Sequence, residues 1–329
     1  MQRVLSGIQP SGSQHIGHLV GAIENFVKLQ EDHEAFYMIA DWHALTSKYE
    51  DVGSIRPATE ELTAAYLAAG LDPSRATIFV QSDVKEHAEL HLLLSMITPL
   101  SWLERVPTYK EKLQNSVADL GSYGFLGYPL LQAADIIIYK ANKVPVGEDQ
   151  LFHLELCREV LRRFHFLFNT EIFPEPQAVI AKAAKVPGLD GRKMSKSYDN
   201  GIFLRDTPDV ITQKCTRQMA SDPARVRRAD PGNPAICNVF DFHKVFSSPE
   251  TCDQIRAECP KAAIGCFDCK KKVAEGMIAR IEPIRQKLEE HLSRPGDIQG
   301  VLHEGAERAR TVAKQTMDEV REAMKLPGY

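Results

Sequence analysis

Hydrophobic and polar positions follow two different periods in the first eighty residues. Residues 3–8, 35–40 and 77–80 form short apolar runs of the length that is typical of buried strands. Between them, apolar residues recur at helical spacing over residues 16–29 and 58–69. Strands separated by helices imply right-handed crossovers and a parallel sheet that is covered on both faces. The pattern therefore predicts an α/β fold for this part of the chain.

The pattern changes farther along the chain. Residues 86–168 have a largely helical pattern, and after them the alternation of strands and helices stops. The tail carries two long amphipathic helices separated by residues 293–296, and Pro283 is expected to kink the first of them. We therefore expect two domains, a parallel-sheet domain over residues 1–200 and an all-helical domain over residues 201–329.

Composition narrows the class of protein. The 329 residues are 43% hydrophobic and 26% charged, which excludes fibrous and disordered chains. The longest apolar runs are far shorter than the roughly 18–20 residues of a membrane-spanning helix. The N-terminus lacks a charged segment followed by a long apolar stretch. We therefore expect a cytoplasmic protein whose seven cysteines are reduced, metal-bound or catalytic.

Charge is divided unevenly between the two expected domains. The net charge is −4, yet residues 201–329 carry 21 Lys and Arg against 19 Asp and Glu. Basic residues there gather in residues 214–228 and in residues 270–272. Such patches on an acidic protein suit the binding of nucleic-acid phosphates, although most clusters of this kind are only solvated faces.

Two glycine-rich loops carry the residues best suited to bind phosphate. The first loop, residues 6–18, leaves the first expected strand and enters a helix, where α/β sheets place their ligands. His15 and His18 can donate hydrogen bonds from one turn of that helix, although surface histidines beside a simple turn would have the same sequence. In the second loop, residues 187–197, two lysines stand three apart and can follow phosphate charge that moves during a reaction.

The same two loops resemble a known family. His15-Ile-Gly-His18 and Lys193-Met-Ser-Lys-Ser197 are similar to the two signature motifs of class I aminoacyl-tRNA synthetases. Three further segments resemble bacterial tryptophanyl-tRNA synthetases: residues 7–12, 133–136 and 144–150. The similarity covers essentially the whole chain and implies a Rossmann-type catalytic domain followed by a helical tRNA-binding domain.

The resemblance implies a two-step reaction. The carboxylate of tryptophan would attack the α-phosphate of ATP to give tryptophanyl-adenylate and pyrophosphate, and the tryptophanyl group would then pass to the 3′ end of tRNA(Trp). Such a displacement needs positioning and neutralisation of phosphate charge. Mg²⁺ would bridge the phosphates. The family further implies a homodimer with its interface between residues 90 and 165, and neither membrane nor DNA as a partner.

The resemblance also implies roles for individual residues. Those acting on the phosphates during catalysis are His15, His18, Lys193 and Lys196. Those binding ATP are Gln9, Ser11, Gly17, His18, Gly147, Asp149, Lys193, Met194, Ser195 and Lys196. Those forming the tryptophan pocket are Gly7, Gln9, His43, Tyr128, Gln132, Asp135, Val144, Val146 and Gln150. Asp149 and Gln150 would equally suit an N-terminal helix cap.

Asp135 is the sole charge in the apolar stretch of residues 130–138, so we expect its helix to be buried on most sides. A buried carboxylate is costly unless a donor binds it. In the family, the aspartate at this place binds the indole N–H of tryptophan, and a site built on such a bond rejects analogues that lack the donor. Without the family, a cap on a neighbouring helix or a pair with a core arginine explains Asp135 equally well.

Five cysteines lie close together in the second expected domain. Cys259, Cys266 and Cys269 fall within eleven positions, Cys237 lies 21 intervening residues upstream of Cys259, and Cys252 is nearby. Four thiolates in a reducing compartment indicate a metal site. The spacing is similar to that of a subset of bacterial tryptophanyl-tRNA synthetases that carry a [4Fe–4S] cluster. Zinc is the main alternative because both groups accept four cysteines, and Cys252 could replace Cys237 as a ligand.

Three other functions fit parts of the sequence. A tyrosyl-tRNA synthetase shares the fold, and a phenol can also bind to Asp135. A non-catalytic RNA-binding or redox-sensing relative would keep the fold, but the intact histidines and lysines of the two loops argue against a loss of activity. A small-molecule nucleotidyltransferase would share the first loop, but neither the second loop nor the helical tail.

Overall fold

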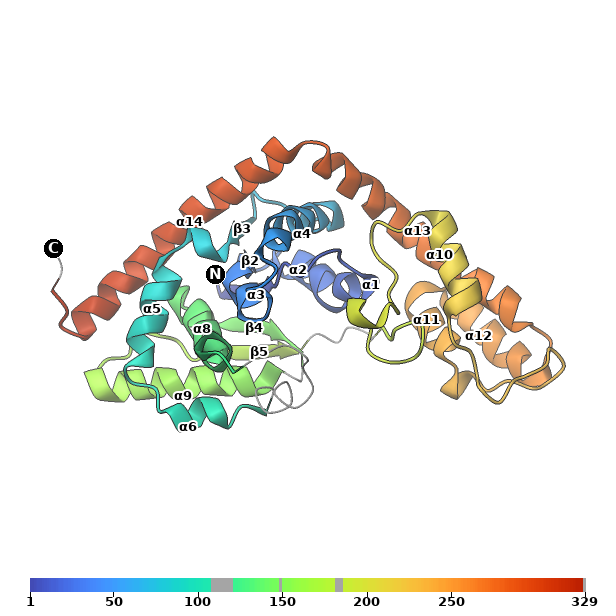
Figure 1. The fold of residues 1–329 in the computed structure, drawn as a ribbon, viewed down its shortest axis with the longest axis horizontal. Coiled ribbons are helices and arrows are strands. Elements are labelled where there is room, and N and C mark those ends of the chain that lie inside the picture. The colour runs from blue at the N-terminus through green and yellow to red at the C-terminus, as the bar shows by residue number, and fades with distance from the viewer. Residues whose placement is uncertain (108–120, 148–149, 181–185, 328–329) are drawn as a thin grey trace.

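A parallel sheet forms the centre of the protein, for which a computed structural model describes residues 1–107, 121–147, 150–180 and 186–327. The strand order is β3-β2-β1-β4-β5, and every neighbouring pair is parallel (Figure 1). The strands are β1 (Arg3–Ile8), β2 (Glu34–Ile39), β3 (Ala76–Val80), β4 (Lys143–Val146) and β5 (Gln177–Ile180). The order reverses direction at β1, so a ligand crevice is expected at the carboxyl ends of β1 and β4.

Successive residues on the inner strands enter two separate hydrophobic cores. On β1, Val4 belongs to one cluster of buried residues and Leu5 to the other. Ile78 and Phe79 divide in the same way on β3. Because side chains alternate between the faces of a strand, both faces of the sheet are covered, as the sequence predicted.

Helices cover the sheet and position the two loops. The helices of this part are α1 (Ile16–His18), α2 (Glu24–Leu29), α3 (Asp41–Lys48), α4 (Ile55–Ala69), α5 (Glu86–Ser95), α6 (Leu100–Glu104), α8 (Tyr123–Ile138) and α9 (Leu151–Phe168). A π-helical segment, Leu19–Ile23, joins α1 to α2. Within the single helix expected over residues 16–29, the hydrogen-bond register therefore changes directly after His18, and such π segments are frequent at functional sites.

The C-terminal part is helical, and its last helix returns to the sheet. Its helices are α10 (Pro208–Gln213), α11 (Asn238–Phe246), α12 (Pro249–Glu258), α13 (Cys266–Leu292) and α14 (Pro295–Ala323). In Figure 1, α13 extends from the side of α10, α11 and α12, and α14 then runs back along the sheet. A Cβ atom at Gly305 would lie 1.8 Å from the carbonyl oxygen of Ile78 on β3, so only glycine permits this close packing. Near the C-terminal end of α14, Glu319 pairs with Lys140 after α8, and Arg321 pairs with Glu89 on α5.

The expected α/β class and the all-helical C-terminal part are both confirmed. The bounds of β1 match the expected strand, whereas β4 and β5 were missed. β4 carries a proline at its third position, and β5 is only partly buried. Helix α13 continues through Pro283 to residue 292. No helix of the described residues has the length and apolarity needed to cross a membrane.

Candidate active site

Backbone pairing brings the first loop against the segment that follows the second loop. The amide of Ile16 donates to the carbonyl of Ile202 at 2.9 Å, and the amide of Leu204 donates to the carbonyl of Gln14 at 2.8 Å. His15 and Phe203 form an antiparallel bridge between these hydrogen bonds. The two loops, far apart in the sequence, are therefore neighbours in the fold.

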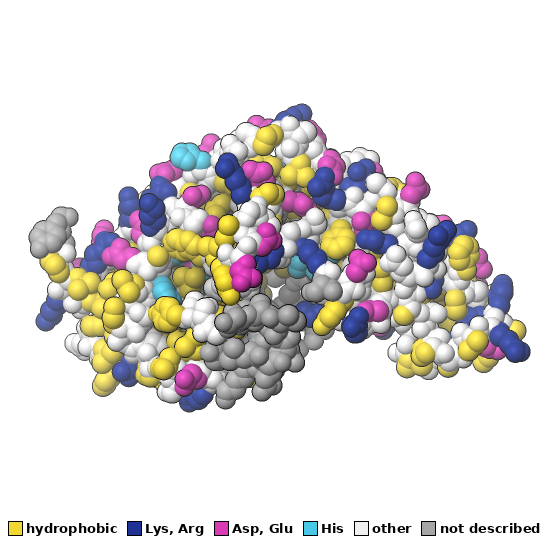
Figure 2. All heavy atoms as spheres, in the orientation of Figure 1, with side chains coloured by type: hydrophobic (Ala, Val, Ile, Leu, Met, Phe, Trp, Pro, Cys, Tyr) yellow, Lys and Arg dark blue, Asp and Glu magenta, His cyan; other side chains and the backbone are white. Residues whose placement is uncertain are grey.

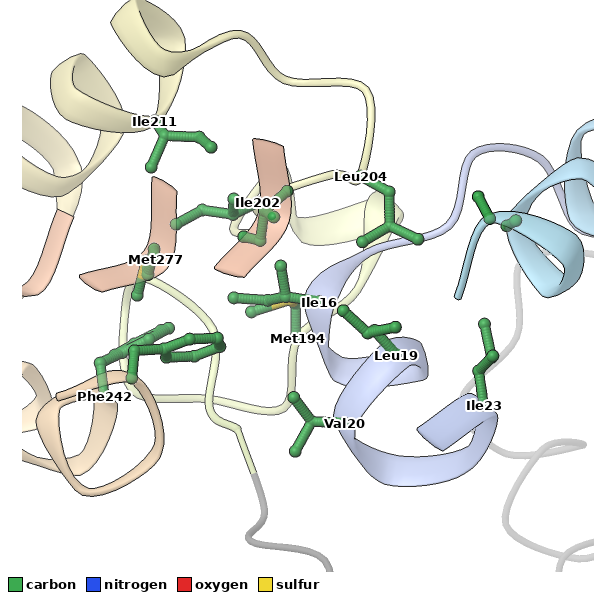
Figure 3. Packing of buried hydrophobic residues seen from close by; sticks show 14 of the residues in the cluster. Ile16, Leu19, Val20, Ile23, Met194, Ile202, Leu204, Ile211, Phe242 and Met277 are labelled. Carbon is green, nitrogen blue, oxygen red and sulfur yellow. The ribbon is translucent and has the colours of Figure 1, made fainter. Parts of the chain in front are cut away.

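A hydrophobic cluster holds this pairing in place. Figure 3 shows Ile16 and Leu19 of the first helical segment packed against Met194, Ile202 and Leu204. Met194 is buried, while Lys193 beside it is exposed and Lys196 is half-buried. Met194 thus helps to anchor the loop, and the lysines stay available for a ligand.

Lys196 reaches the turn of the first loop. Its Nζ donates to the carbonyl oxygen of Ser11 at 2.9 Å, and Nζ of Lys48 donates to the same oxygen at 3.3 Å. Gly12, with a φ of 102°, leaves room for this contact, since a Cβ there would lie 3.0 Å from Nζ of Lys196. Burial, followed by the charge of Lys48, lowers the pKa of Lys196 to about 8 against the opposing effect of Glu61. Two ammonium groups that share one carbonyl are well placed to receive a phosphate.

His15 and His18 are neutral, stacked and incompletely hydrogen-bonded. Their ring centroids lie 3.7 Å apart with 21° between the planes. Burial and the charges of nearby residues, Lys196 among them, lower the pKa of His15 to about 4 and that of His18 to about 3. Nδ1 of each ring is buried without a hydrogen-bond partner among the described residues. Both histidines therefore offer hydrogen bonds to a ligand rather than a positive charge.

Asn200 organises the second loop, a role that the sequence analysis did not predict. It is buried, its Oδ1 accepts from the amide of Ser195 at 2.8 Å, and its Nδ2 donates to Asp190 at 2.8 Å and to the carbonyl of Lys193 at 3.1 Å. Hydrogen bonds from Asn200 and Arg192 lower the pKa of Asp190 to about 2. A Cβ at Gly188 would lie 2.2 Å from Asn200, so this glycine is needed where the loop crosses the amide. A lone asparagine after the motif gives no signal of this role in the sequence.

Asp135 lies at the centre of a buried polar network. Its Oδ2 is 2.7 Å from Nε2 of His43, and its Oδ1 is 2.7 Å from Nδ1 of His87 and 2.8 Å from Nε2 of Gln81. Burial alone would raise the pKa of Asp135, but the hydrogen bonds from His43 and His87 hold it well below its ordinary value. The partners are side chains from three other segments rather than a helix end or an arginine. Gln81 and His87 are site residues that the sequence did not reveal.

Of the other residues expected around tryptophan, Tyr128 contacts this network through His43. The ring of Tyr128 packs edge-on against His43 and His153, and its hydroxyl is 3.0 Å from Nε2 of His153. Nδ1 of His153 is 2.8 Å from Oε1 of Gln150. Gly7 lies on β1, Val144 and Val146 lie on β4, Gln132 is half-buried on α8, and Gln9 is exposed in the first loop. Gly147 follows β4 at the surface, and Asp149 lies outside the described residues.

An open, mostly apolar cavity of about 380 Å³ lies beside Tyr128. The residues that line it are Trp42, Leu45, Thr46, Tyr49, His91, Ser122, Tyr123, Gly124, Gly127, Tyr128 and Leu131. Of the residues expected to bind tryptophan, Tyr128 alone belongs to this described lining. The cavity therefore borders the predicted tryptophan residues at Tyr128, and Asp135 does not line it.

The four expected cysteines line one small cavity in the helical part. Cys237 precedes α11, Cys259 follows α12, and Cys266 and Cys269 lie in the first turn of α13. All four border a cavity of about 20 Å³. Sγ of Cys252 instead donates to the carbonyl of His243 at 3.3 Å, outside this lining. Cys237, and not Cys252, is thus the fourth cysteine in the described lining of this cavity.

A buried guanidinium and a strongly shifted thiol pKa mark the surroundings of this cysteine cavity. Nη1 of Arg225 lies 3.7 Å from Sγ of Cys259, and Arg225 is itself buried. Burial, followed by the neighbouring cysteines, raises the pKa of Cys269 to about 12, so a thiolate there requires a compensating positive charge. A Cβ at Gly232 would lie 2.5 Å from Sγ of Cys259, which shows how closely the backbone wraps this sulfur. No group of three or more His, Cys, Asp or Glu side chains among the described residues is arranged to hold a metal ion.

Basic side chains lie beside this cavity on α13. Nζ of Lys271 lies 4.7 Å from the ring centre of Phe267, an exposed aromatic residue, and Lys270 and Lys272 are its neighbours. Figure 2 shows Lys and Arg side chains over this end of the molecule. The surface carries the charge that an RNA backbone requires.

Comparisons with known proteins agree with the geometry. The family described as "tRNA synthetases class I (W and Y)" matches residues 1–282. A protein of Thermotoga maritima named tryptophan–tRNA ligase is 53% identical over 98% of this chain and 99% of its own length. A tryptophan–tRNA ligase of Ralstonia nicotianae is 40% identical over 99% of this chain and 98% of its own length. The structure of tryptophanyl-tRNA synthetase from Campylobacter jejuni, complexed with ADP and tryptophan, matches with a TM-score of 0.89 and 34% identity over 99% of this chain and 100% of that one.

Proposed function

Because the chain belongs to the class I tRNA synthetases for tryptophan and tyrosine, we propose that its site joins L-tryptophan to tRNA(Trp) in two steps. In the first step, a carboxylate oxygen of tryptophan attacks the α-phosphorus of ATP, the bond to the β-phosphate oxygen breaks, and pyrophosphate leaves. In the second step, a hydroxyl of the terminal ribose of the tRNA attacks the carbonyl of the adenylate, and AMP leaves.

The phosphates lie between the two loops in this proposal. His15 and His18 donate hydrogen bonds from Nδ1, which has no partner among the described residues. Because the pKa of each ring is lowered, these donors are neutral imidazoles. Lys193 and Lys196 neutralise the pyrophosphate as it leaves, and Lys196 exchanges its bond to the Ser11 carbonyl for phosphate oxygens. The remaining proposed ATP contacts are Gln9, Ser11, Gly17, Gly147, Asp149, Met194 and Ser195. Mg²⁺ enters as the complex with ATP, because the two loops supply cations and hydrogen-bond donors.

Tryptophan lies against Asp135, which accepts the indole N–H. Among the described residues, three donors occupy three of the roughly four lone-pair positions of this carboxylate, which leaves one acceptor position on Oδ2. The other proposed contacts are Gly7, Gln9, His43, Tyr128, Gln132, Val144, Val146 and Gln150. Relatives named for tryptophan, at up to 53% identity over nearly the whole chain, support tryptophan over tyrosine.

The contact between Lys196 and the first loop is the observation that carries the assignment. We expect the purified protein to exchange pyrophosphate into ATP in the presence of tryptophan and to charge tRNA(Trp). Exchange supported by tyrosine instead would indicate the alternative specificity. Absence of exchange with either amino acid would support a non-catalytic relative.

The four-cysteine cavity holds a [4Fe–4S] cluster in this proposal, with Cys237, Cys259, Cys266 and Cys269 as ligands. The four thiols line one cavity, and Nη1 of Arg225 lies 3.7 Å from Sγ of Cys259, which supports a shared group at this place; a cluster and zinc both accept four cysteines. When bound, the cluster would supply the positive charge that keeps these thiols ionised. Protein purified without oxygen is expected to be brown and to contain iron, whereas a colourless sample that contains zinc would support the alternative.

The helical part docks the tRNA through Lys270, Lys271 and Lys272. Replacing Lys270 and Lys271 by alanine should weaken tRNA binding and reduce its dependence on salt, by about one unit of slope for each lost phosphate contact. Lys28→Ala, at an exposed lysine of α2, is the control. Unchanged affinity and slope in the double variant would contradict the proposal.

Two copies of the chain associate through the region of residues 90–165. Leu92, Met96, Leu100 and Tyr123 are large hydrophobic residues that are more than half exposed. Figure 2 shows hydrophobic side chains gathered over the part of the molecule where Figure 1 places α5 and α9. Light scattering should give the mass of a dimer, and Met96→Glu should reduce it to that of a monomer.

A further inference from the structure

Behind Asp135 lies a chain of buried hydrogen bonds for which the proposed reaction has no use. His87 on α5 joins Asp135 to Tyr139, with 2.7 Å between its Nδ1 and Oδ1 of Asp135 and 2.7 Å between its Nε2 and the Tyr139 hydroxyl. His87, Tyr139 and Gln81 are completely buried. A buried polar network of this kind is costly unless its members are hydrogen-bonded, as Asp135, His87 and Tyr139 are here; of the four side chains, Gln81 alone keeps an atom, Oε1, without a partner among the described residues.

The directions of these hydrogen bonds follow from the chemistry of the groups. An ionised Asp135 can only accept, so Nδ1 of His87 carries the proton that lies between them. In the neutral ring, Nε2 is then an acceptor, and the hydroxyl of Tyr139 donates to it. Asp135 therefore sets the tautomer of His87, and the Tyr139 hydroxyl satisfies the remaining ring nitrogen and holds the ring in place.

Tyr139 itself has little freedom to move. Its ring stacks on Phe36 of β2 with 4.6 Å between centroids and meets Phe79 of β3 edge-on at 5.5 Å. Burial, followed by the charge of Asp135, raises its pKa, so the hydroxyl keeps its proton and remains a donor. The orientation of Asp135 is thus tied to the central strands of the sheet.

We propose that His87, held by Tyr139, is a positioning residue that fixes the Asp135 carboxylate so that its open acceptor position meets the indole N–H of tryptophan. The inference rests on the proposed function, because it requires that Asp135 binds the indole. His87 and Gln81 both bind Oδ1, which leaves the open position on Oδ2, the oxygen that faces His43. A fixed carboxylate that only accepts selects ligands that carry a donor at that place.

The experiment compares tryptophan with its isostere in which sulfur replaces the ring N–H, β-(benzothiophen-3-yl)alanine. Pyrophosphate exchange gives kcat/KM for each compound, and their ratio measures the bond to Asp135. The wild-type protein should prefer tryptophan by on the order of 10⁴-fold, because the isostere leaves a buried carboxylate position without a donor. His87→Leu and Tyr139→Phe should lower this ratio by roughly 10- to 100-fold, the range for a hydrogen bond to a charged group.

Two further variants separate positioning from a structural role. His87→Asn keeps an amide donor near the place of Nδ1 and should retain most of the preference. Tyr37→Phe is the matched control, since Tyr37 is also completely buried and its hydroxyl donates to the carbonyl of Phe26 at 2.9 Å. It should lower thermal stability without changing the ratio.

The outcomes distinguish the inference from the function on which it rests. A wild-type ratio near one would overturn the role of Asp135 and, with it, the role of His87. A large wild-type ratio that His87→Leu and Tyr139→Phe leave unchanged, while kcat/KM falls equally for both compounds, would overturn the positioning role alone. If His87→Leu does not fold, the ratio in Tyr139→Phe, which loses only one oxygen atom, decides between these outcomes.

Discussion

The two ends of the proposed site treat their polar groups in opposite ways. At the phosphate end, Nδ1 of His15 and of His18 has no partner in the described part of the chain, and Lys196 is bound to a backbone carbonyl with its pKa lowered. At the tryptophan end, Asp135 receives hydrogen bonds from three buried side chains. Charge moves from the α-phosphate to a leaving group during the reaction, whereas the indole ring does not change. The phosphate end, which must change partners, thus keeps its polar groups loosely bound, whereas the tryptophan end holds its carboxylate in one orientation with one acceptor position left for the ligand.

The largest expected effect concerns Asp135 at the tryptophan end. Asp135→Ala removes the acceptor for the indole and leaves His43, His87 and Gln81 without their partner. We expect kcat/KM for tryptophan to fall by on the order of 10⁴-fold. Pyrophosphate exchange with tryptophan and tyrosine measures both the loss and the specificity. A variant that still prefers tryptophan over tyrosine as strongly as the wild type would remove Asp135 from recognition.

At the phosphate end, Lys196→Ala should lower the rate of adenylate formation by roughly 10²- to 10³-fold, as is typical for the loss of one group that stabilises developing charge. Binding of tryptophan, measured by calorimetry, should stay close to the wild-type value because Asp135 is untouched. Lys244→Ala, at an exposed lysine paired with Asp241 on α11, is the control. Wild-type turnover in Lys196→Ala would contradict its role.

The pH dependence of kcat/KM for ATP tests the role of Lys196 at the phosphate end without removing its side chain. The ammonium form of Lys196 is the active one, and its pKa of about 8 means that this form predominates at pH 7 and is lost as the pH rises. We expect kcat/KM for ATP to fall above about pH 8, by roughly tenfold for each further unit. Lys196→Arg, which stays charged, should move the fall to higher pH. An unchanged profile would assign the fall to another group.

The smallest expected effect lies outside both ends, in the cysteine cavity. Cys259→Ser should lower the metal content and the thermal midpoint, by roughly 2–4 °C for each kcal/mol that is lost. Pyrophosphate exchange should change little. Cys252→Ser is the matched control, because Cys252 is buried nearby but does not line the cavity. Equal metal loss in the two variants would show that the cavity is not the binding site.

Much of the fold could be predicted because it depends on local patterns. The strand at residues 3–8 was predicted with its observed bounds, and the two long C-terminal helices were expected from their spacing. β4 was missed because Pro145 interrupts a strand of only four residues. The return of α14 to the sheet was also invisible, since it depends on Gly305 fitting against Ile78 more than two hundred residues away.

The same distinction applies to the site. Residues inside short motifs, such as His15 and Lys196, could be found because their neighbours in the sequence identify them. His87 and Gln81 lie 48 and 54 residues from Asp135 and belong to other elements, so only the fold brings them together. Asn200 supports the second loop from outside the motif. Supporting residues act through tertiary contacts, and a single sequence carries no pattern for these.

The central claim is that the two loops act together on one triphosphate. A double-mutant cycle of His18→Ala and Lys196→Ala, measured as the rate of pyrophosphate exchange, tests it directly. We predict that the double variant loses little more activity than the poorer single variant, which corresponds to a coupling of roughly 0.5–3 kcal/mol. Losses that simply multiply would show that the two residues act independently and would contradict the account.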